Sequence, residues 1–129
     1  MERIIIIVIM DQVSGRDTER EFRDNDLPQT VINNIRCALK VLHNGGLVFG
    51  DLRHPNIMVT KSPADRYGDN EWHGQLIDFN WSGKKGEATY PTMLNDKILK
   101  IKWAPGVEAA AVILSQHDRD MLKQACGDW

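Results

Sequence analysis

The stretch of sequence that decides the fold lies near the middle of the chain and reads Gly50-Asp51-Leu52-Arg53-His54-Pro55-Asn56-Ile57-Met58-Val59. Within it an acid and an amide, Asp51 and Asn56, stand five residues apart. A run of β-prone apolar residues follows the amide directly. We therefore expect a tight loop that carries both polar side chains and leads into a hydrophobic strand.

A second stretch places an aspartate at the end of another hydrophobic run and reads Leu76-Ile77-Asp78-Phe79-Asn80. The segment between the two runs, residues 61–74, is polar and contains Gly and Pro, so the pair is predicted to form a β-hairpin. Phosphoryl transfer needs a carboxylate to orient or deprotonate the attacking hydroxyl, and it needs hard oxygen ligands for magnesium. Asp51, Asn56 and Asp78 have the side chains for these tasks, and we predict that they converge around a divalent ion.

The segment before the loop has the periodicity of an amphipathic helix. Over residues 28–43 its apolar residues recur at helical spacing, at Val31, Ile32, Ile35, Ala38, Leu39 and Leu42. Asp26 is the expected N-cap, and Gly45 with Gly46 is expected to end the helix through a left-handed residue. His43, in the last turn, is expected to be a cap or packing residue rather than a catalyst.

The remaining segments complete an expected α+β fold that is mainly helical and holds one or two small β-hairpins. Residues 4–10 are continuously apolar and predict a buried strand, whereas residues 14–26 are strongly charged and predict a solvated loop or a short exposed helix. Residues 81–107 hold scattered Gly and Pro and predict a long loop. Residues 108–125, which include an alanine run, predict a helix with a break near residues 115–116.

The composition is that of an ordinary globular domain. The 129 residues fit one domain, and a formal net charge of -2 gives no general reason to expect nucleic-acid binding. The apolar run at residues 4–10 is too short to span a bilayer, so no membrane contact and a soluble, intracellular location are expected. Cys37 and Cys126 lack metal-ligand spacing and are expected to be reduced thiols. The oligomeric state is left open.

The two polar stretches, taken together, resemble motifs of the protein kinase-like superfamily. Asp-Leu-x-x-x-Asn followed by Ile-Met-Val at residues 51–59 resembles the kinase catalytic loop, and Ile-Asp-Phe-Asn at residues 77–80 resembles the D-F-G motif. Lys-Gly-Glu-Ala-Thr-Tyr-Pro at residues 85–91 is similar to stretches in the kinase-like domains that are abundant in fungi. The resemblance covers most of the chain, from the first strand to about Leu122.

The resemblance implies a fold like the C-lobe of a protein kinase. Residues 1–129 would form a partial kinase-like domain with a hinge strand, the catalytic loop, the metal-binding motif, an activation-segment-like loop and the start of a bracing helix. Asp51 would be the catalytic base, and Arg53 would replace the loop lysine that contacts the transferred phosphate. Asn56 and Asp78 would bind the Mg²⁺ of Mg-ATP, so ATP and magnesium are the implied ligands.

Three further features of the resemblance concern the site. The stretch from His117 to Leu122 resembles the start of the helix whose buried aspartate braces the catalytic loop, which makes Asp118 the candidate brace, with a helix N-cap as the alternative. Gly50-Asp51 is similar to the His-Gly-Asp loop of choline and aminoglycoside kinases. The sequence shows no glycine-rich phosphate loop and no Val-Ala-x-Lys strand, so the N-lobe is expected to be largely absent and turnover by this chain alone to be impaired.

The sequence leaves three functions open. The first is an enzyme that transfers the γ-phosphate of ATP, with magnesium, to Ser or Thr hydroxyls of a protein partner. The second is a pseudokinase fragment that keeps the binding surface without turnover. The third, motivated by Gly50-Asp51, is a phosphotransferase that acts on small molecules.

Overall fold

The computed structural model of the chain describes residues 9, 15–22, 27–61, 71–94 and 101–126. Within these residues the protein forms a small α+β fold with two antiparallel sheets. The strand expected at residues 4–10 lies outside the described residues, apart from Ile9.

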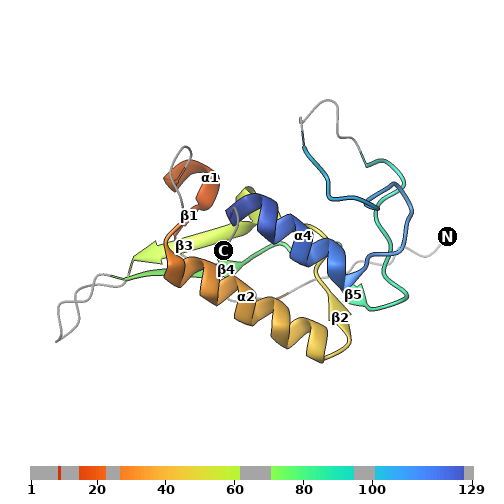
Figure 1. The fold of residues 1–129 in the computed structure, drawn as a ribbon, viewed down its shortest axis with the longest axis horizontal. Helices are drawn as coiled ribbons and strands as arrows, with labels where there is room; N and C mark the ends of the chain where they lie inside the picture. Colours follow the sequence, from red (N-terminus) through yellow and green to blue (C-terminus); the bar gives the residue numbers. More distant parts are fainter. Residues whose placement is uncertain (1–8, 10–14, 23–26, 62–70, 95–100, 127–129) are drawn as a thin grey trace.

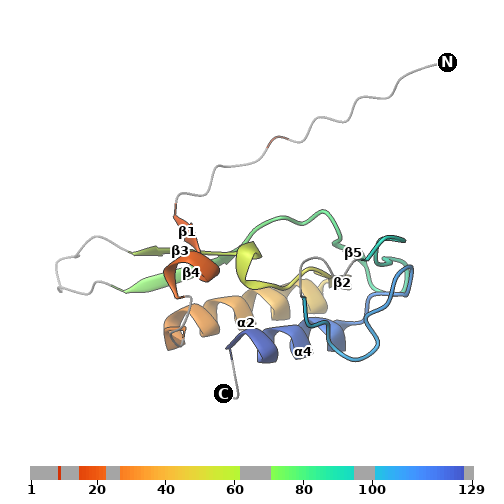
Figure 2. The same cartoon turned by 90° about the horizontal axis from the view of Figure 1, so that it is seen from above.

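The described elements are short strands and helices of different lengths, of which α2 and α4 are the two long helices. Along the chain they are β1 (Arg16–Asp17), α1 (Thr18–Glu21), α2 (Gln29–Asn44), β2 (Leu47–Val48), the 3-10 helix η1 (His54–Asn56), β3 (Ile57–Lys61), β4 (Trp72–Leu76), β5 (Gly83–Lys84) and α4 (Ser115–Cys126). One sheet has the order β1-β3-β4, and β2 pairs with β5 in the other. Figure 2 shows α2 packed along the β3–β4 hairpin, with α4 beside α2.

Helix α2 forms as its apolar periodicity predicts. Residues three and four apart share one side of a helix, and the side that α2 buries carries Val31, Ile32, Ile35 and Leu39. The helix ends at Asn44, and Gly46 then takes a φ of 76°, a left-handed conformation that glycine adopts at little cost. The N-cap is Pro28 rather than Asp26, and Asp26 itself lies outside the described residues.

The predicted hairpin of β3 and β4 is present, and its register brings the two polar motifs together. Ile57 pairs with Leu76 at one end, and Lys61 pairs with Trp72 at the other. The residues just before β3 therefore lie beside the residues just after β4. Strand β4 includes polar and glycine positions that carry no strand signal of their own, because pairing with β3 supplies their hydrogen bonds.

The expectation of a mainly helical fold is wrong, because helices hold only 37% of the described residues. Of the helix predicted over residues 108–125, only the part from Ser115 onward is helical. Before it, Ala110 has a φ of 62°, which no right-handed helix permits, and the Ile113 N–H donates to the Ala88 carbonyl at 2.8 Å. Hydrogen bonds to a distant segment thus override the helix propensity of the alanine run. Figure 1 shows the described parts of the segment between β5 and α4 looping out beyond the start of α4.

The charged segment at residues 14–26 is more ordered, where it is described, than a solvated loop. Arg16 and Asp17 pair with β3, and Asp17 also caps α1 by accepting the Arg20 N–H at 2.9 Å. Thr18 is fully buried. The prediction of a short helix is confirmed by α1, whereas its expected exposure is wrong at Thr18.

One hydrophobic core joins both long helices to the strands. Its largest fully buried side chains come from every part of the described chain and include Phe49, Ile35, Leu52, Ile57, Ile113 and Leu122. Phe49 and Leu52 flank Asp51 in the sequence, so the core anchors the polar loop on both sides of its acid. Among the described helices, none has the length and apolar character needed to cross a membrane.

Candidate functional site

The loop between β2 and β3 is closed by hydrogen bonds among its own residues. The Asn56 side chain donates from Nδ2 to the Asp51 carbonyl at 2.9 Å, and the Asn56 N–H donates to the Arg53 carbonyl at 2.9 Å. Asp51 and Asn56 are buried, with exposed fractions of 5% and 6%. Buried polar groups that are bonded to one another favour a single arrangement, so the loop holds the Asp51 carboxylate in a defined place.

Helix α4 fixes the start of this loop through the carboxylate of Asp118. Its Oδ2 accepts the Phe49 N–H and its Oδ1 accepts the Gly50 N–H, each at 2.8 Å. His43, at the end of α2, contacts Oδ2 through Nε2 at 2.9 Å. Asp118 is 1% exposed, so these partners replace the water that a carboxylate requires. The bracing contact expected of Asp118 is present, and the N-cap alternative is wrong because α4 begins at Ser115.

Gly50 allows the backbone to pass between two close neighbours. Its φ is 91°, in the left-handed region that favours glycine. A Cβ at this position would meet Ile113 Cδ1 at 2.9 Å and Trp81 Cβ at 3.2 Å. The glycine before Asp51 is therefore required by backbone conformation and by packing, whatever molecule the loop serves.

The hairpin register places Asp78 beside Asn56. The Ile77 N–H donates to the Asn56 carbonyl at 3.0 Å, and Asp78 is the next residue. Asp78 is exposed and has a φ of 63°, a conformation that aspartate tolerates better than most residues. Its Oδ1 accepts the Asn80 N–H at 3.3 Å, which supports the turn. The three predicted side chains Asp51, Asn56 and Asp78 thus come from segments that meet at Asn56.

The available oxygen atoms suit a metal ion that is shared with a phosphate ligand. Asn56 uses Nδ2 toward the loop, and neither its Oδ1 nor the Oδ2 of Asp78 has a hydrogen-bond partner among the described residues. The described residues contain no group of three or more His, Cys, Asp or Glu side chains that could hold a metal by itself. Magnesium is commonly bound by one or two protein oxygens together with substrate phosphates and water. Asn56 and Asp78 fit that mode of binding.

Arg53 stands between the Asp51 carboxylate and an aromatic ring. Its Nε donates to Asp51 Oδ1 at 2.7 Å, and its Nη2 donates to Oδ2 at 3.4 Å. The guanidinium carbon lies 5.8 Å from the centroid of the Trp103 ring, within the range of a cation–π contact. The sequence prediction placed Arg53 at the site but missed Trp103, because the two residues are fifty positions apart and no local pattern links them.

A pair of phenylalanines joins the two motifs behind the polar groups. The rings of Phe49 and Phe79 pack edge to face, with centroids 5.2 Å apart. Phe49 is fully buried, whereas Phe79 remains 50% exposed. The Ser82 hydroxyl also donates to the Phe49 carbonyl at 3.1 Å. Each phenylalanine lies two residues or fewer from a predicted acid, and that proximity is the only sequence signal for this contact.

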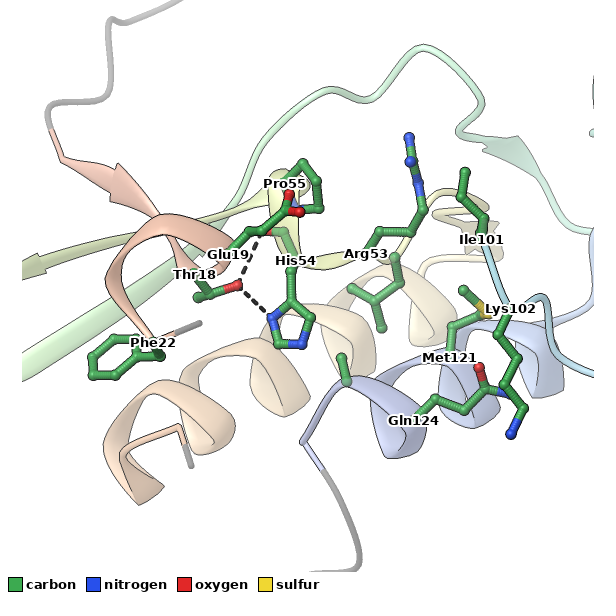
Figure 3. A pocket seen from close by; sticks show the side chains of 12 residues that line it. Thr18, Glu19, Phe22, Arg53, His54, Pro55, Ile101, Lys102, Met121 and Gln124 are labelled. Atoms are coloured by element: carbon green, nitrogen blue, oxygen red, sulfur yellow. Dashed lines mark hydrogen bonds between the residues drawn. The ribbon is translucent and has the colours of Figure 1, made fainter. Parts of the chain in front are cut away.

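A cavity of about 530 Å³ opens on the Arg53 side of the loop. Figure 3 shows it between α1 on one side and Ile101 with Lys102 on the other. Its walls mix apolar side chains such as Met121 with the polar side chains of Gln124 and Lys102. Of the four predicted site residues, Arg53 lines this cavity. The volume lies within the range of small-ligand sites.

His54 connects this cavity to α1. Its Nδ1 lies 2.8 Å from the Thr18 hydroxyl, and that hydroxyl donates to the His54 carbonyl at 3.0 Å. Because a hydroxyl has one proton to give, the imidazole Nδ1 carries the proton in the contact with Thr18. Figure 3 shows both bonds at the α1 wall of the cavity. No local sequence pattern predicts this contact, because Thr18 and His54 are 36 positions apart.

Burial of His54 is expected to make the free energy of unfolding depend on pH. Desolvation lowers the pKa of the imidazole below its ordinary value of 6.5 and outweighs the opposing effects of Glu19, the Ala125 carbonyl and Asp17. The folded protein therefore keeps His54 neutral in a pH range where the unfolded chain already binds a proton. The stability that His54 contributes should be complete above pH 6.5 and should be lost as the pH falls from 6.5 toward the lowered pKa of the folded state.

The variant His54→Gln tests this dependence through urea unfolding at several pH values between about 5 and 8. The wild type should lose more stability on acidification than His54→Gln, because glutamine does not titrate. His73→Gln, at an exposed position of β4, is the matched control and should follow the wild type. If the stability of the wild type and that of His54→Gln depended on pH in the same way, the pKa of His54 would not be lowered by folding.

No protein-family model matches this chain. The kinase-like resemblance of the two motifs therefore stays a prediction. What the described residues add is an arrangement: a buried acid on a braced loop, an amide bonded to that loop, and an exposed acid on the neighbouring turn.

Proposed function

We propose that this chain carries the acceptor-side and metal-side groups of a kinase-like phosphotransfer site, which binds Mg-ATP and transfers its γ-phosphate to a protein hydroxyl. One observation carries the proposal. Asn56 joins both acids, because its side chain bonds the Asp51 carbonyl and its own carbonyl accepts the N–H of the residue before Asp78. Phosphoryl transfer is catalysed mainly by such positioning of charged groups, so a small set of residues suffices.

Each residue has a role in this proposal. Asp51 orients the acceptor hydroxyl and takes its proton. Arg53, whose guanidinium already lies at the Asp51 carboxylate, offers positive charge to the phosphate that moves between ATP and the acceptor. Asn56 Oδ1 and the Asp78 carboxylate hold the metal. Bound magnesium would supply neutralisation of the charge that develops on the phosphate oxygens.

The cavity beside Arg53 is the proposed approach of the acceptor. It lies next to the residue that contacts Asp51, and its mixed lining can receive both apolar and polar parts of a molecule. A cavity of about 530 Å³ admits a peptide side chain or a small molecule. Acceptor profiling with Ser- and Thr-containing peptides and with small amino alcohols therefore identifies the class of acceptor.

A second candidate function is nucleotide binding without turnover. The observation that favours it is the close pairing of Asp51 with Arg53, in which the guanidinium contacts both carboxylate oxygens at 2.7 Å and 3.4 Å. A hydroxyl acceptor has to share the Asp51 carboxylate with this guanidinium. If the guanidinium leaves no carboxylate oxygen accessible to the acceptor, the metal-binding groups at Asn56 and Asp78 can still bind Mg-ATP.

A thermal-shift titration tests binding under both candidates. A ligand that binds only the folded state stabilises it by RT ln(1 + [L]/Kd), or about 2.7 kcal/mol at a hundredfold excess over Kd. We expect Mg-ATP to raise the Tm of the wild type, and we expect Asp78→Asn to reduce that shift severalfold because the amide carries no charge for the metal. Asp120→Asn, on the half-exposed side of α4, should keep the full shift. A wild type that is not stabilised by millimolar Mg-ATP would exclude both candidates for this chain.

A further inference from the structure

The guanidinium of Arg53 is held from two directions. On one side it makes the ion pair with Asp51, at 2.7 Å from Nε to Oδ1. On the other side lies the face of the Trp103 indole, 5.8 Å from the guanidinium carbon. The Arg53 side chain is 25% exposed, so water screens neither contact fully. The position of Trp103 therefore bears on the geometry of the Asp51 carboxylate.

A row of aromatic rings connects Trp103 to helix α4. Trp103 packs on Trp81 with centroids 5.9 Å apart, and Trp81 packs edge to face on Tyr90 at 6.3 Å. The Tyr90 hydroxyl lies 2.9 Å from Nδ1 of His117. The Leu114 N–H donates to the same nitrogen at 3.2 Å, which makes it an acceptor, so the tyrosine hydroxyl is the donor. Burial raises the pKa of Tyr90, which keeps that hydroxyl protonated at neutral pH.

The row of rings ends next to the residue that braces the loop. His117 precedes Asp118 on α4, and Asp118 holds the backbone of the loop at Phe49 and Gly50. Helix α4 thus reaches Asp51 by two routes, one to its backbone through Asp118 and one to its side chain through the aromatic row and Arg53. A hydrogen bond from the Ala104 N–H to the Met121 sulfur at 3.2 Å ties the chain next to Trp103 to the same helix.

We propose that Trp103 is a positioning residue of the phosphotransfer site: its ring face orients the Arg53 guanidinium, which in turn orients the Asp51 carboxylate. The expected effect of Trp103 on turnover rests on the proposed function, whereas its expected effect on the position of the Arg53 guanidinium does not. Loss of the ring frees Arg53 to leave the carboxylate, and turnover should then fall while nucleotide binding through Asn56 and Asp78 persists.

The indole N–H of Trp103 has no part in this role. Nε1 is buried and has no hydrogen-bond partner among the residues that the structure describes, although a buried donor without a partner is unfavourable. Trp103→Phe removes that donor and keeps an aromatic face, so it should preserve the positioning of Arg53. Trp103→Leu removes the face and keeps an apolar side chain, so it should abolish the positioning. Trp103→Met takes the place of Trp103→Leu if the leucine variant does not fold, since methionine fills irregular space without a ring.

The first test follows the Arg53 Nε–H by NMR, with Arg53→Lys used to assign the signal. In the wild type this proton is bonded to Asp51 and should exchange slowly with water. Trp103→Leu should speed its exchange by about three- to thirtyfold, the factor that corresponds to the usual range of cation–π energies. Trp103→Phe should restore slow exchange. Unchanged exchange in Trp103→Leu would overturn the proposal.

The matched control is a second tryptophan that also packs under a cation. Lys61 Nζ lies 5.6 Å from the centroid of the Trp72 ring, on the β3–β4 hairpin. Trp72→Leu removes a contact of the same type and a comparable packed ring, and it should leave the Arg53 Nε–H as in the wild type. Equal acceleration of exchange in Trp72→Leu would show general loosening and would also overturn the proposal.

The second test separates positioning from binding. With Mg-ATP and an accepted hydroxyl substrate, Trp103→Leu should lower kcat by about three- to thirtyfold, with the KM for ATP close to the wild-type value. A higher KM for ATP with unchanged kcat would contradict a positioning role. If the wild type transfers no phosphate, the proposed function fails, and the exchange of the Arg53 Nε–H alone decides the role of Trp103.

Discussion

Asp118→Ala is expected to lower the free energy of unfolding by about 3–5 kcal/mol. The substitution removes a carboxylate that is 1% exposed and leaves the Phe49 and Gly50 N–H groups buried without an acceptor. It also removes the partner of His43 Nε2. Each buried donor left unpaired costs about 1–3 kcal/mol, so the loss is large for a domain of this size. Urea unfolding, followed by circular dichroism at neutral pH, measures the change.

Two further aspartate variants show whether the loss of stability comes from the hydrogen bonds that the Asp118 carboxylate accepts. Asp118→Asn keeps the shape of the side chain but offers one oxygen to two N–H groups. Its free energy of unfolding should therefore lie between those of the wild type and Asp118→Ala. Asp120→Asn changes a carboxylate two residues away, where Oδ1 accepts the exposed Gln116 amide at 2.7 Å, and should change stability by less than about 0.5 kcal/mol. A loss for Asp118→Ala as small as that for Asp120→Asn would disprove the bracing role.

Asp51→Asn is expected to reduce the rate of phosphate transfer by about 10²- to 10⁴-fold, the usual contribution of a positioned general base. The amide has nearly the shape of the carboxylate, and the loop is held through the Asp51 carbonyl and through Asp118 rather than through the side chain that is changed. The fold should therefore persist. Incorporation of labelled phosphate from ATP into an accepted substrate measures the rate.

The binding of nucleotide separates this effect from a general loss of structure. Asp51→Asn should keep the thermal shift with Mg-ATP, because Asn56 and Asp78 are unchanged. Arg53→Lys keeps a positive charge at the site but loses the planar fork, and it should show an intermediate rate. Equal rates in the wild type and in Asp51→Asn would remove Asp51 from the mechanism.

The elements that the sequence predicts well are those whose pattern is local. Helix α2 repeats apolar residues at a spacing that puts Val31, Ile35 and Leu39 on one face, and no distant partner is needed to recognise it. The β3–β4 hairpin likewise follows from two apolar runs with a polar segment between them. The hydrogen bonds of α2 lie within the segment that carries its pattern, whereas the hairpin extends beyond its apolar runs, because Trp72, His73 and Gly74 of the predicted loop pair with β3.

The elements that the sequence predicts poorly depend on distant partners. The alanine run at residues 109–111 has high helix propensity, yet the Tyr90 N–H donates to the Ala111 carbonyl at 2.9 Å, and Thr89 pairs with Val112. Only the folded chain brings these segments together. The same reason applies to β1, whose two residues form a strand because β3 leaves an edge beside them.

The residues of the candidate site also differ in whether a local pattern or a distant contact identifies them. Asp51, Asn56 and Asp78 could be selected from the sequence because their motifs are short, and the hairpin then explains how they meet. Asp118 could be named only through resemblance to a known family, since a lone aspartate on a helix has several ordinary roles. The contact of Trp103 with Arg53 has no sequence signal, because it depends on where a long irregular segment returns to the core.

Asn56 and Asp78 are proposed to share one divalent ion that is bound with a nucleotide. Manganese can replace magnesium in such sites, and its unpaired electrons broaden the NMR signals of nearby protons. With a small amount of Mn-ATP, the Asn56 side-chain amide signal and the Asp78 N–H signal should be lost selectively, whereas the Val41 N–H signal, on the exposed face of α2, should stay sharp. Signals of Asn56 and Asp78 that broaden no more than that of Val41 would show that these two residues do not share a metal ion.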